Sequence, residues 1–208
     1  MTQPLEREDH FATLEQQAQA VKIGLAAFLG SEALLFTGIL ALITAYRADW
    51  PAAFSVGIHH NTKILGSINT VVLLTSSAII AIAVELRRVA KTRAAAFLTL
   101  STAGLGVVFV IIKLTEYAHH FHDGIYPGAR GMFFQQHHEP GLPTFWTLYY
   151  LATGLHAIHV TIGVCVLSYR GIRDLVAPTH EHALEATALY WHLVDVIWIF
   201  LWPLFYLA

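Results

Sequence analysis

The sequence predicts an all-α membrane protein: a bundle of five transmembrane helices with its N-terminus in the cytoplasm. Of the 208 residues, 56% are hydrophobic and only 12% are charged, whereas average soluble domains are about 25% charged. Five continuous apolar runs are each long enough to cross the hydrocarbon core as a helix. Lysine and arginine are also distributed unequally between the two sides that these runs define. The first two observations predict the fold class, and the third predicts the orientation.

The apolar runs place the predicted spans at about residues 21–46, 64–86, 94–117, 145–169 and 184–207. A polar N-terminal tail, residues 1–20, precedes them. It carries four acidic residues and one arginine, unlike the basic start of a signal peptide. No loop is long enough to bury a core of its own. Residues 21–208 are therefore expected to form one five-helix membrane domain.

Basic residues gather on one side of the predicted bundle. Eight lie on the N-terminal side: Arg7, Lys22, Arg87, Arg88, Lys91, Arg93, Arg170 and Arg173. Four lie on the other side: Arg47, Lys63, Lys113 and Arg130. Cytoplasmic loops carry the excess of Lys and Arg, which predicts a cytoplasmic N-terminus and an external C-terminus. The formal net charge of −2 provides no basic field, so no nucleic-acid partner is expected.

Ionisable residues within the predicted spans are the first functional candidates, because a charge inside a bilayer is costly. Glu32 lies near the middle of the first span. His156 and His159 lie near the middle of the fourth, and His192 and Asp195 near the middle of the fifth. Two interpretations of Glu32 stay open: a protonated glutamate held by one hydrogen bond, or a group that anchors a lipid head group or supports proton supply.

The spacing of these residues predicts polar faces on two helices. The fourth span carries Ala152, His156, His159 and Gly163 at helical spacing, and the fifth carries Glu185, Ala188, His192 and Asp195. Facing stripes of this kind pack together, away from lipid. The predicted internal polar seam therefore contains His156, His159, His192, Asp195 and Glu185, without a metal.

Two further contacts are expected from spacing. Lys113 and Glu116 are three residues apart near the outer end of the third span, which favours a local ion pair. The first span carries a stripe of small residues, Gly24, Ala27, Ser31 and Gly38, which lets another helix approach closely. That helix belongs either to this chain or to a partner.

Three interpretations fit the intramembrane polar residues alone. The first is haem or metal binding by histidines of two helices. The second is proton or solute transport through Glu32, His159 and Asp195. The third is interhelical hydrogen bonding in a non-catalytic subunit. The loop histidines could bind a metal, but are expected to be solvated on the outer face: His119, His120, His122, His137 and His138.

Five segments resemble subunit III of haem–copper terminal oxidases, in order and over nearly the whole chain after residue 21. Residues 31–38 read SEALLFTG, similar to the glutamate motif of that family's first matching span. Residues 68–74 read INTVVLL, and residues 115–117 read TEY. Residues 152–160 read ATGLHAIHV, which resembles the T-G-x-H-x-x-H-V signature. Residues 185–198 read EATALYWHLVDVIW, which resembles the final span.

The resemblance implies a subunit without haem or copper of its own, in a bacterial inner membrane. Haem and copper are expected in partner subunits. The main partner would be the catalytic subunit I, with further contacts to subunit II and other subunits of the complex. In that family, subunit III is thought to stabilise the oxygen-reducing centre during turnover and to support proton uptake. The resemblance also implies phospholipid near Glu32.

The YWH form of the last motif favours a cytochrome c oxidase. A quinol oxidase or a nitric-oxide-reductase-associated homologue stays open, because other subunits determine the electron donor. A free-standing haem-binding or proton-translocating membrane protein is the alternative from a different class. Larger family members have seven helices, the first two forming one arm of a lipid-filled cleft. This chain lacks those two, so we do not expect it to form the complete cleft alone.

Overall fold

The computed structural model describes residues 13–128, 131–177 and 181–207, and every regular element in these ranges is a helix. The helices are α1 (Leu14–Asp49), α2 (Pro51–His60), α3 (Lys63–Arg88), α4 (Thr92–His122), α5 (Phe133–Gln136), α6 (Leu142–Val176) and α7 (Glu181–Tyr206). Five of them, α1, α3, α4, α6 and α7, are long and apolar enough to cross a membrane. The predicted all-α fold with five spanning helices is thus confirmed.

The first helix begins before the apolar run, inside the segment expected as a polar tail. Thr13 caps it, because the Thr13 side chain accepts a hydrogen bond from the Gln16 backbone N–H at 3.1 Å. The helix ends at Asp49, just before Trp50 and Pro51. Pro51 then occupies the first turn of α2, a position that tolerates its missing N–H. The loop expected between the first two spans therefore contains a short helix.

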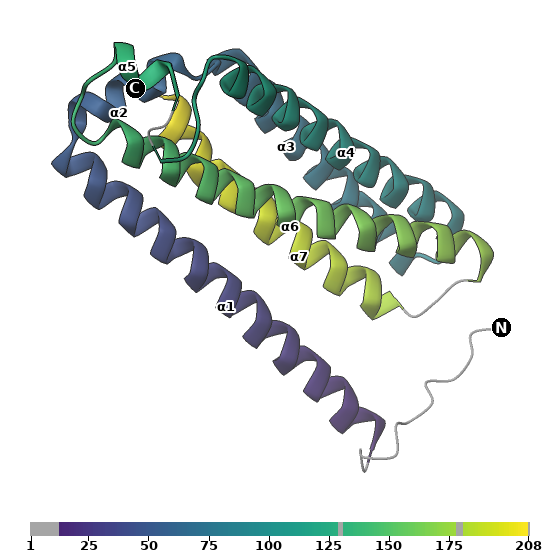
Figure 1. The fold of residues 1–208 in the computed structure, drawn as a ribbon. Helices are drawn as coiled ribbons and strands as arrows, with labels where there is room; N and C mark the ends of the chain where they lie inside the picture. The colour runs from purple at the N-terminus through teal and green to yellow at the C-terminus, as the bar shows by residue number, and fades with distance from the viewer. Residues whose placement is uncertain (1–12, 129–130, 178–180, 208) are drawn as a thin grey trace.

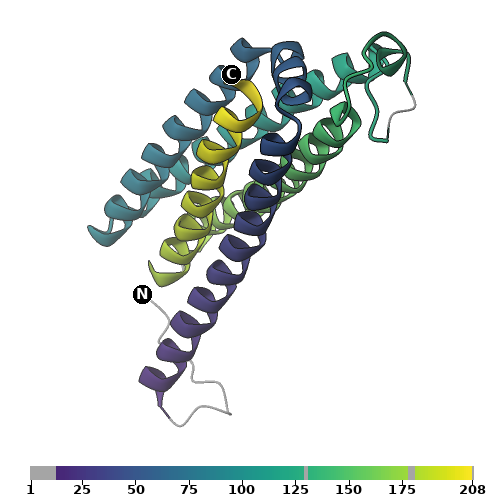
Figure 2. The ribbon, with the colours of Figure 1, turned by 90° about the vertical axis from the view of Figure 1, so that its left-hand side faces the viewer.

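The helices α3, α4, α6 and α7 form a bundle, and α1 stands apart from most of it (Figures 1 and 2). The short helices α2 and α5 lie at the same end as the C-terminus (Figure 1), which we call the capped end. The tight α3–α4 turn, residues 89–91, lies at the opposite end, which we call the turn end. Helix α1 contacts α6 and α7.

Close helix packing depends on small residues at two points. A Cβ on Gly66 of α3 would lie 2.7 Å from the ring of Tyr206. A Cβ on Gly163 of α6 would lie 2.8 Å from the ring of Trp191. Contacts this short are not tolerated, so glycine lets the aromatic residues of α7 fit against its neighbours. These contacts fix the position of α7 in the bundle.

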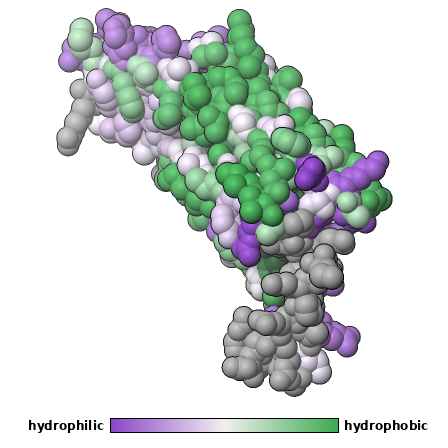
Figure 3. All heavy atoms as spheres, turned by 90° about the vertical axis from the view of Figure 1, so that its right-hand side faces the viewer, coloured by the Kyte–Doolittle hydropathy of each residue, from purple (hydrophilic) through white to green (hydrophobic). Residues whose placement is uncertain are grey.

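The surface is apolar along the bundle and hydrophilic at both ends (Figure 3). Helix α1 is the extreme case: among its described side chains, only Phe36 and Ile43 are buried. A Cβ added at Gly24 or Gly38 would meet nothing within 4 Å in the described chain. The small-residue stripe of α1 therefore does not pack on another helix of this chain, and packing on a partner helix stays a prediction.

Candidate functional site

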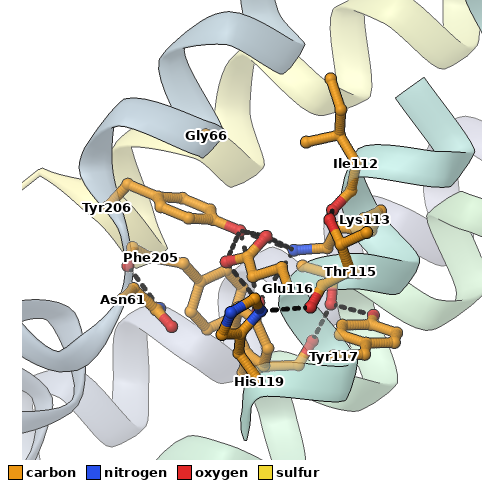
Figure 4. Close-up of polar contacts among 12 residues, drawn as sticks. Asn61, Gly66, Ile112, Lys113, Thr115, Glu116, Tyr117, His119, Phe205 and Tyr206 are labelled. Carbon is orange, nitrogen blue, oxygen red and sulfur yellow. Dashed lines mark hydrogen bonds and ion pairs between the residues drawn. The ribbon is translucent and has the colours of Figure 1, made fainter. Parts of the chain in front are cut away.

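A fully enclosed ionic cluster joins α4, α6 and α7 near the capped end (Figure 4). The side chains of Lys113 and Glu116 are each 1% exposed, and Lys113 Nζ lies 3.0 Å from Glu116 Oε2. Lys113 Nζ also donates to the hydroxyls of Tyr149 and Tyr206, at 2.9 and 2.6 Å. The spacing of three residues thus produces the contact between Lys113 and Glu116, and two distant tyrosines complete it. We call these four residues the Lys113 cluster.

The hydrogen bonds of the Lys113 cluster form a closed network among its four residues. Tyr149 donates to Glu116 Oε1 at 2.9 Å, and Tyr206 approaches Oε1 and Oε2 at 2.7 and 3.0 Å. An ammonium group has three donors, and three acceptors surround Lys113. The rings of Tyr117, Tyr149, Trp198 and Tyr206 lie 4.6–5.5 Å from Nζ and add cation–π attraction. A buried ion pair is tolerated when it is satisfied in this way.

A second carboxylate, Glu32, links α1 to α6. His159 Nε2 lies 2.9 Å from Glu32 Oε2, and His159 Nδ1 lies 2.8 Å from the Leu155 carbonyl oxygen. The carbonyl can only accept, so Nδ1 carries a hydrogen. The Nε2–Glu32 hydrogen bond then needs one more proton, on either the imidazole or the carboxyl group. Glu32 and His159 therefore share a single proton.

A cavity of about 410 Å³ opens beside the Glu32–His159 pair, between α1, α6 and α7. Its remaining lining is mostly apolar: Phe28, Ile162, Val166, Ala186, Thr187 and Tyr190. Phe28 and Tyr190 stack with their ring centroids 6.1 Å apart. An apolar cavity with one polar pair at its wall suits an amphipathic ligand.

A third polar group lies between α3 and α7. Ser77 Oγ of α3 lies 2.7 Å from His192 Nδ1 of α7. Asp195 lies one turn further along α7. Asp195 is 3% exposed, and within the described chain neither of its oxygens has a partner in good hydrogen-bond geometry.

The remaining predicted seam residues lie elsewhere. His156 is fully buried, with its ring stacked on Trp198 at 5.1 Å and edge-on to Phe109 at 5.5 Å. Neither of its nitrogens has a hydrogen-bond partner in the described chain. Glu185 lies at the turn end, where Arg88 Nη2 is 3.0 Å from its Oε1.

The structure therefore does not gather the five residues into one seam between α6 and α7. Of the two histidine side chains of α6, that of His156 contacts α7 as expected, through Trp198, whereas His159 meets α7 through its backbone carbonyl, which accepts from the Tyr190 hydroxyl. His159 points to α1, and His192 and Glu185 point to α3. The reason is that α7 packs on α3 as well as on α6, and α1 covers part of α6. Helical spacing predicts which side chains share a face, but not which helix that face meets.

The loop histidines differ from the expectation in one case. His119, His122 and His138 are exposed, whereas His120 is 3% exposed and packs edge-on against Trp146 at 4.9 Å. The prediction that all five are solvated is wrong for His120, because the capped end folds over it. In the described ranges, no group of three or more His, Cys, Asp or Glu side chains is arranged to hold a metal ion.

His60 is a further titratable group of the capped end. Its Nε2 lies 3.7 Å from Asp123 Oδ2, and its ring packs 4.8 Å from that of Phe133. Burial lowers the pKa of His60 from its usual value, and the nearby Asp123 carboxylate partly opposes that effect. The neutral imidazole is thus favoured in the folded protein.

Sequence reasoning missed Tyr149 and Tyr206, which complete the Lys113 cluster. Both resemble ordinary aromatic residues of apolar helices. The only available signal was the cost of burying Lys113 and Glu116, which demands extra hydrogen-bond partners without naming them.

Comparisons with known proteins agree with this architecture. A family model described as cytochrome c oxidase subunit III matches residues 141–208. The probable quinol oxidase subunit 3 of Staphylococcus haemolyticus (strain JCSC1435) is 28% identical over 200 residues, covering 92% of this chain and 90% of that protein. The protein of the same name from Staphylococcus epidermidis (strain ATCC 12228 / FDA PCI 1200) is 29% identical over 192 residues, covering 89% and 88%.

The last third of the chain is similar to the cytochrome c oxidase subunit III family, and most of the chain is similar to proteins named probable quinol oxidase subunit 3. The resemblance seen in the sequence motifs is thereby confirmed. The residues matched by the family model include α6, α7 and both of the last two motifs. The five long apolar helices and these similarities indicate a multi-pass membrane protein, and the relatives are named as subunits of an oxidase.

Proposed function

We propose that this chain is subunit III of a quinol-oxidising haem–copper oxidase. The observation that carries the proposal is its match, over 89–92% of its length, to proteins named probable quinol oxidase subunit 3. The YWH motif favoured a cytochrome c oxidase instead, and the names of these relatives favour the quinol alternative over it. The family description that names cytochrome c matches only the last third of the chain, residues 141–208.

The proposed role within the complex is structural. The Lys113 cluster uses all of its polar atoms to join three helices of this chain, which leaves those groups no capacity for chemistry on a substrate. Haem and copper belong to the partner subunits in this proposal. This chain would pack against subunit I, stabilise it during oxygen reduction and support proton uptake.

A phospholipid is the proposed ligand of the cavity beside Glu32. The cavity is mostly lined by apolar side chains that suit an acyl chain, and the Glu32–His159 pair lies at its wall. Its position between α1 and the bundle is accessible from the apolar surface of the protein.

The test is purification of the complex through an affinity tag on this chain. We expect a large multi-span haem protein to co-purify, and the complex to reduce oxygen with a quinol as donor but not with reduced cytochrome c. Oxidation of cytochrome c would overturn the quinol assignment. A Soret band in the isolated chain would overturn the proposal that it holds no haem.

A further inference from the structure

Helix α1 is packed against the bundle along one half more than along the other. In the half near the capped end, the side chains of Phe36 and Ile43 are buried. In the half near the turn end, none of the described side chains of residues 13–31 is buried. A Cβ at Gly24 or Gly30 would meet nothing within 4 Å in the described chain. The turn-end half of α1 therefore has little packing to hold it in place (Figure 1).

Glu32 and Phe28 make the contacts that bring this half of α1 against α6 and α7. Glu32 Oε2 lies 2.9 Å from His159 Nε2, and one turn earlier the ring of Phe28 stacks on that of Tyr190 with centroids 6.1 Å apart. Phe28 is still 45% exposed, so the stacking buries only part of its ring. The same two residues are the ones through which α1 lines the cavity. The wall that α1 gives to the cavity is thus held largely by one hydrogen bond.

The middle of α1 has a sequence at which helices bend. Gly30 and Ser31 directly precede Glu32, and glycine–serine pairs are among the known positions of helix kinks. The Ser31 hydroxyl donates to the Phe28 carbonyl oxygen at 2.7 Å, and the Thr37 hydroxyl donates to a carbonyl oxygen one turn earlier at 2.7 Å. Bonds of this kind compete with the backbone ladder and favour bending. The turn-end half can therefore pivot about this point while the other half stays packed.

The hydrogen bond between Glu32 and His159 exists only while the pair carries its shared proton. His159 Nδ1 donates its hydrogen to the Leu155 carbonyl oxygen at 2.8 Å, so Nε2 either donates as an imidazolium or accepts from a protonated carboxyl group. Without that proton, a lone pair of Nε2 faces the lone pairs of the carboxylate, and the contact becomes repulsive. A second proton would still leave an N–H donor and a carbonyl acceptor in place. The bond is therefore lost only when the pH rises.

The charged and titratable groups that face the pair do not replace this proton. On α7, the Tyr190 hydroxyl donates to the His159 carbonyl oxygen at 3.1 Å and is thereby engaged with the backbone. On α6, His156 is fully buried among aromatic rings one turn away. On α1, no other charged side chain lies between Lys22 and Arg47. The hydrogen bond thus depends on the proton of the pair itself.

The cavity connects the pair with the polar turn end. The side chains of Glu32 and His159 are 19% and 13% exposed, and both line the cavity. Ala186 and Thr187 line it as well, in the second turn of α7, the helix that begins at the turn end with Glu181. Proton exchange with the pair therefore has a path along the cavity and needs no route through the packed bundle.

We propose that the Glu32–His159 pair is a proton-dependent latch on the cavity between α1, α6 and α7. With the shared proton in place, the turn-end half of α1 lies against the bundle and closes one wall of the cavity. When the proton passes to water, this half of α1 swings outward about Gly30 and Ser31, and the cavity opens toward the membrane. Return of the proton closes it. The latch rests on contacts of this chain, and only the molecule admitted, a phospholipid, rests on the proposed function.

The test is a distance measurement by pulsed electron paramagnetic resonance on the purified complex, with spin labels on keto amino acids placed in this chain alone. One label replaces Ile23 of α1 and the other Ile172 of α6, both exposed. Raising the pH from mildly acidic to alkaline should add a longer distance. The ratio of open to closed molecules should rise roughly tenfold or more, as expected for the loss of a charge-assisted hydrogen bond. Labels at Leu42 and Leu151, beside the packed half of α1, should keep their distance.

Substitutions of Glu32 separate a latch from a simple packing contact. Glu32→Gln keeps a hydrogen bond without a titratable proton, because the amide N–H donates to His159 Nε2. This variant should stay closed over the whole pH series. Glu32→Ala should be open over the whole series. Glu15→Gln, the same change at an exposed glutamate of α1, should keep the pH dependence of the wild type.

Two results would overturn the latch. One is a wild-type distance that stays the same at every pH, and the other is a pH dependence that persists in Glu32→Gln. If Glu32→Ala does not assemble, Glu32→Gln still decides between the two outcomes. The occupant is tested separately, by mass spectrometry of isotope-labelled phospholipid taken up by the complex at each pH. Opening without phospholipid exchange would confirm the latch and overturn the phospholipid as its occupant.

Discussion

Glu116 and Glu32 are both carboxylates within spanning helices, and their environments are opposite. Glu116 is 1% exposed and bonded to one lysine and two tyrosines from three helices. Glu32 is 19% exposed, its carboxyl group contacts His159, and a cavity lies at its side. The first site is complete without any other molecule. The second is open on one side, on a helix with few buried side chains.

The difference separates two roles within one chain: the Lys113 cluster stabilises the bundle, whereas the Glu32 site lies outside that stabilising network. Every donor of Lys113 is satisfied within the bundle, so a change there leaves a buried charge uncompensated. The Glu32–His159 contact lies between α1 and α6 beside a cavity, so a change there leaves the contacts among α3, α4, α6 and α7 in place. Substitutions in the two places should therefore have effects of different size and kind.

The largest effect is expected from breaking the ion pair of the Lys113 cluster. Glu116→Leu leaves the Lys113 ammonium buried without a counter-ion, at a cost of about 3–5 kcal/mol. We expect this loss in the free energy of unfolding, measured by thermal denaturation of the purified complex. Replacing both residues, Lys113→Met with Glu116→Leu, should recover most of it. Equal damage from the double and single substitutions would contradict the ion-pair interpretation.

A smaller effect is expected when one partner of the cluster is trimmed. Tyr206→Phe removes a hydroxyl that donates to Glu116 and accepts from Lys113, at a cost of about 1–3 kcal/mol. The same denaturation measurement checks it. Tyr126→Phe, at an exposed tyrosine of the capped end, is the matched control and should leave the transition unchanged.

Glu32→Ala should shorten the time for which the complex remains active during turnover, without changing its initial rate or its free energy of unfolding. The Glu32 carboxyl contacts His159 and the cavity but no reacting group of this chain. We expect the oxygen consumption of the complex to start at nearly the wild-type rate and to decay faster during sustained turnover. Glu85→Ala, at an exposed glutamate of α3, should show neither change. Immediate loss of activity in a fully assembled complex would place Glu32 on the reaction path.

The smallest effect is expected at His60. Burial lowers the pKa of His60 in the folded protein, so the folded state resists protonation. The stabilisation is fully present above the unfolded-state pKa of about 6.5 and is lost as the pH falls below it. His60→Gln should therefore flatten the dependence of the melting temperature on pH below about 6.5. A melting curve that stays equally pH-dependent would show that another group is responsible.

The sequence was sufficient to predict the spanning helices, but not to predict which helices pack against one another. Apolar runs identified all five spanning helices, because a bilayer imposes a minimum length on each. Spacing also placed Lys113 beside Glu116, since residues three apart meet on one helix. It did not identify Tyr149 or Tyr206, which come from other helices. His159 and Glu32 were both singled out, yet their contact depends on how α1 lies across α6.

The same limit explains the division of the predicted polar seam. His156 and His192 were assigned to facing stripes of adjacent spans, which is a reasonable default for antiparallel neighbours. In the structure, Trp191 and Trp198 bond to α3 and turn the polar face of α7 toward that helix. The absence of a side chain at Gly66 and Gly163 permits this arrangement. A pattern of polar residues alone does not predict it.

The Lys113 cluster also imposes an order on the biogenesis of the protein. Glu116 and Tyr206 are separated by 90 residues, so at 5–20 residues per second the ribosome completes α7 roughly 5–20 seconds after α4. Lys113 and Glu116 have only each other as partners until α6 supplies Tyr149, and Tyr206 joins them last. Helix α4 is the most apolar of the five spanning helices, which favours its insertion despite the charges of Lys113 and Glu116. Final closure of the bundle thus waits for the last helix to arrive.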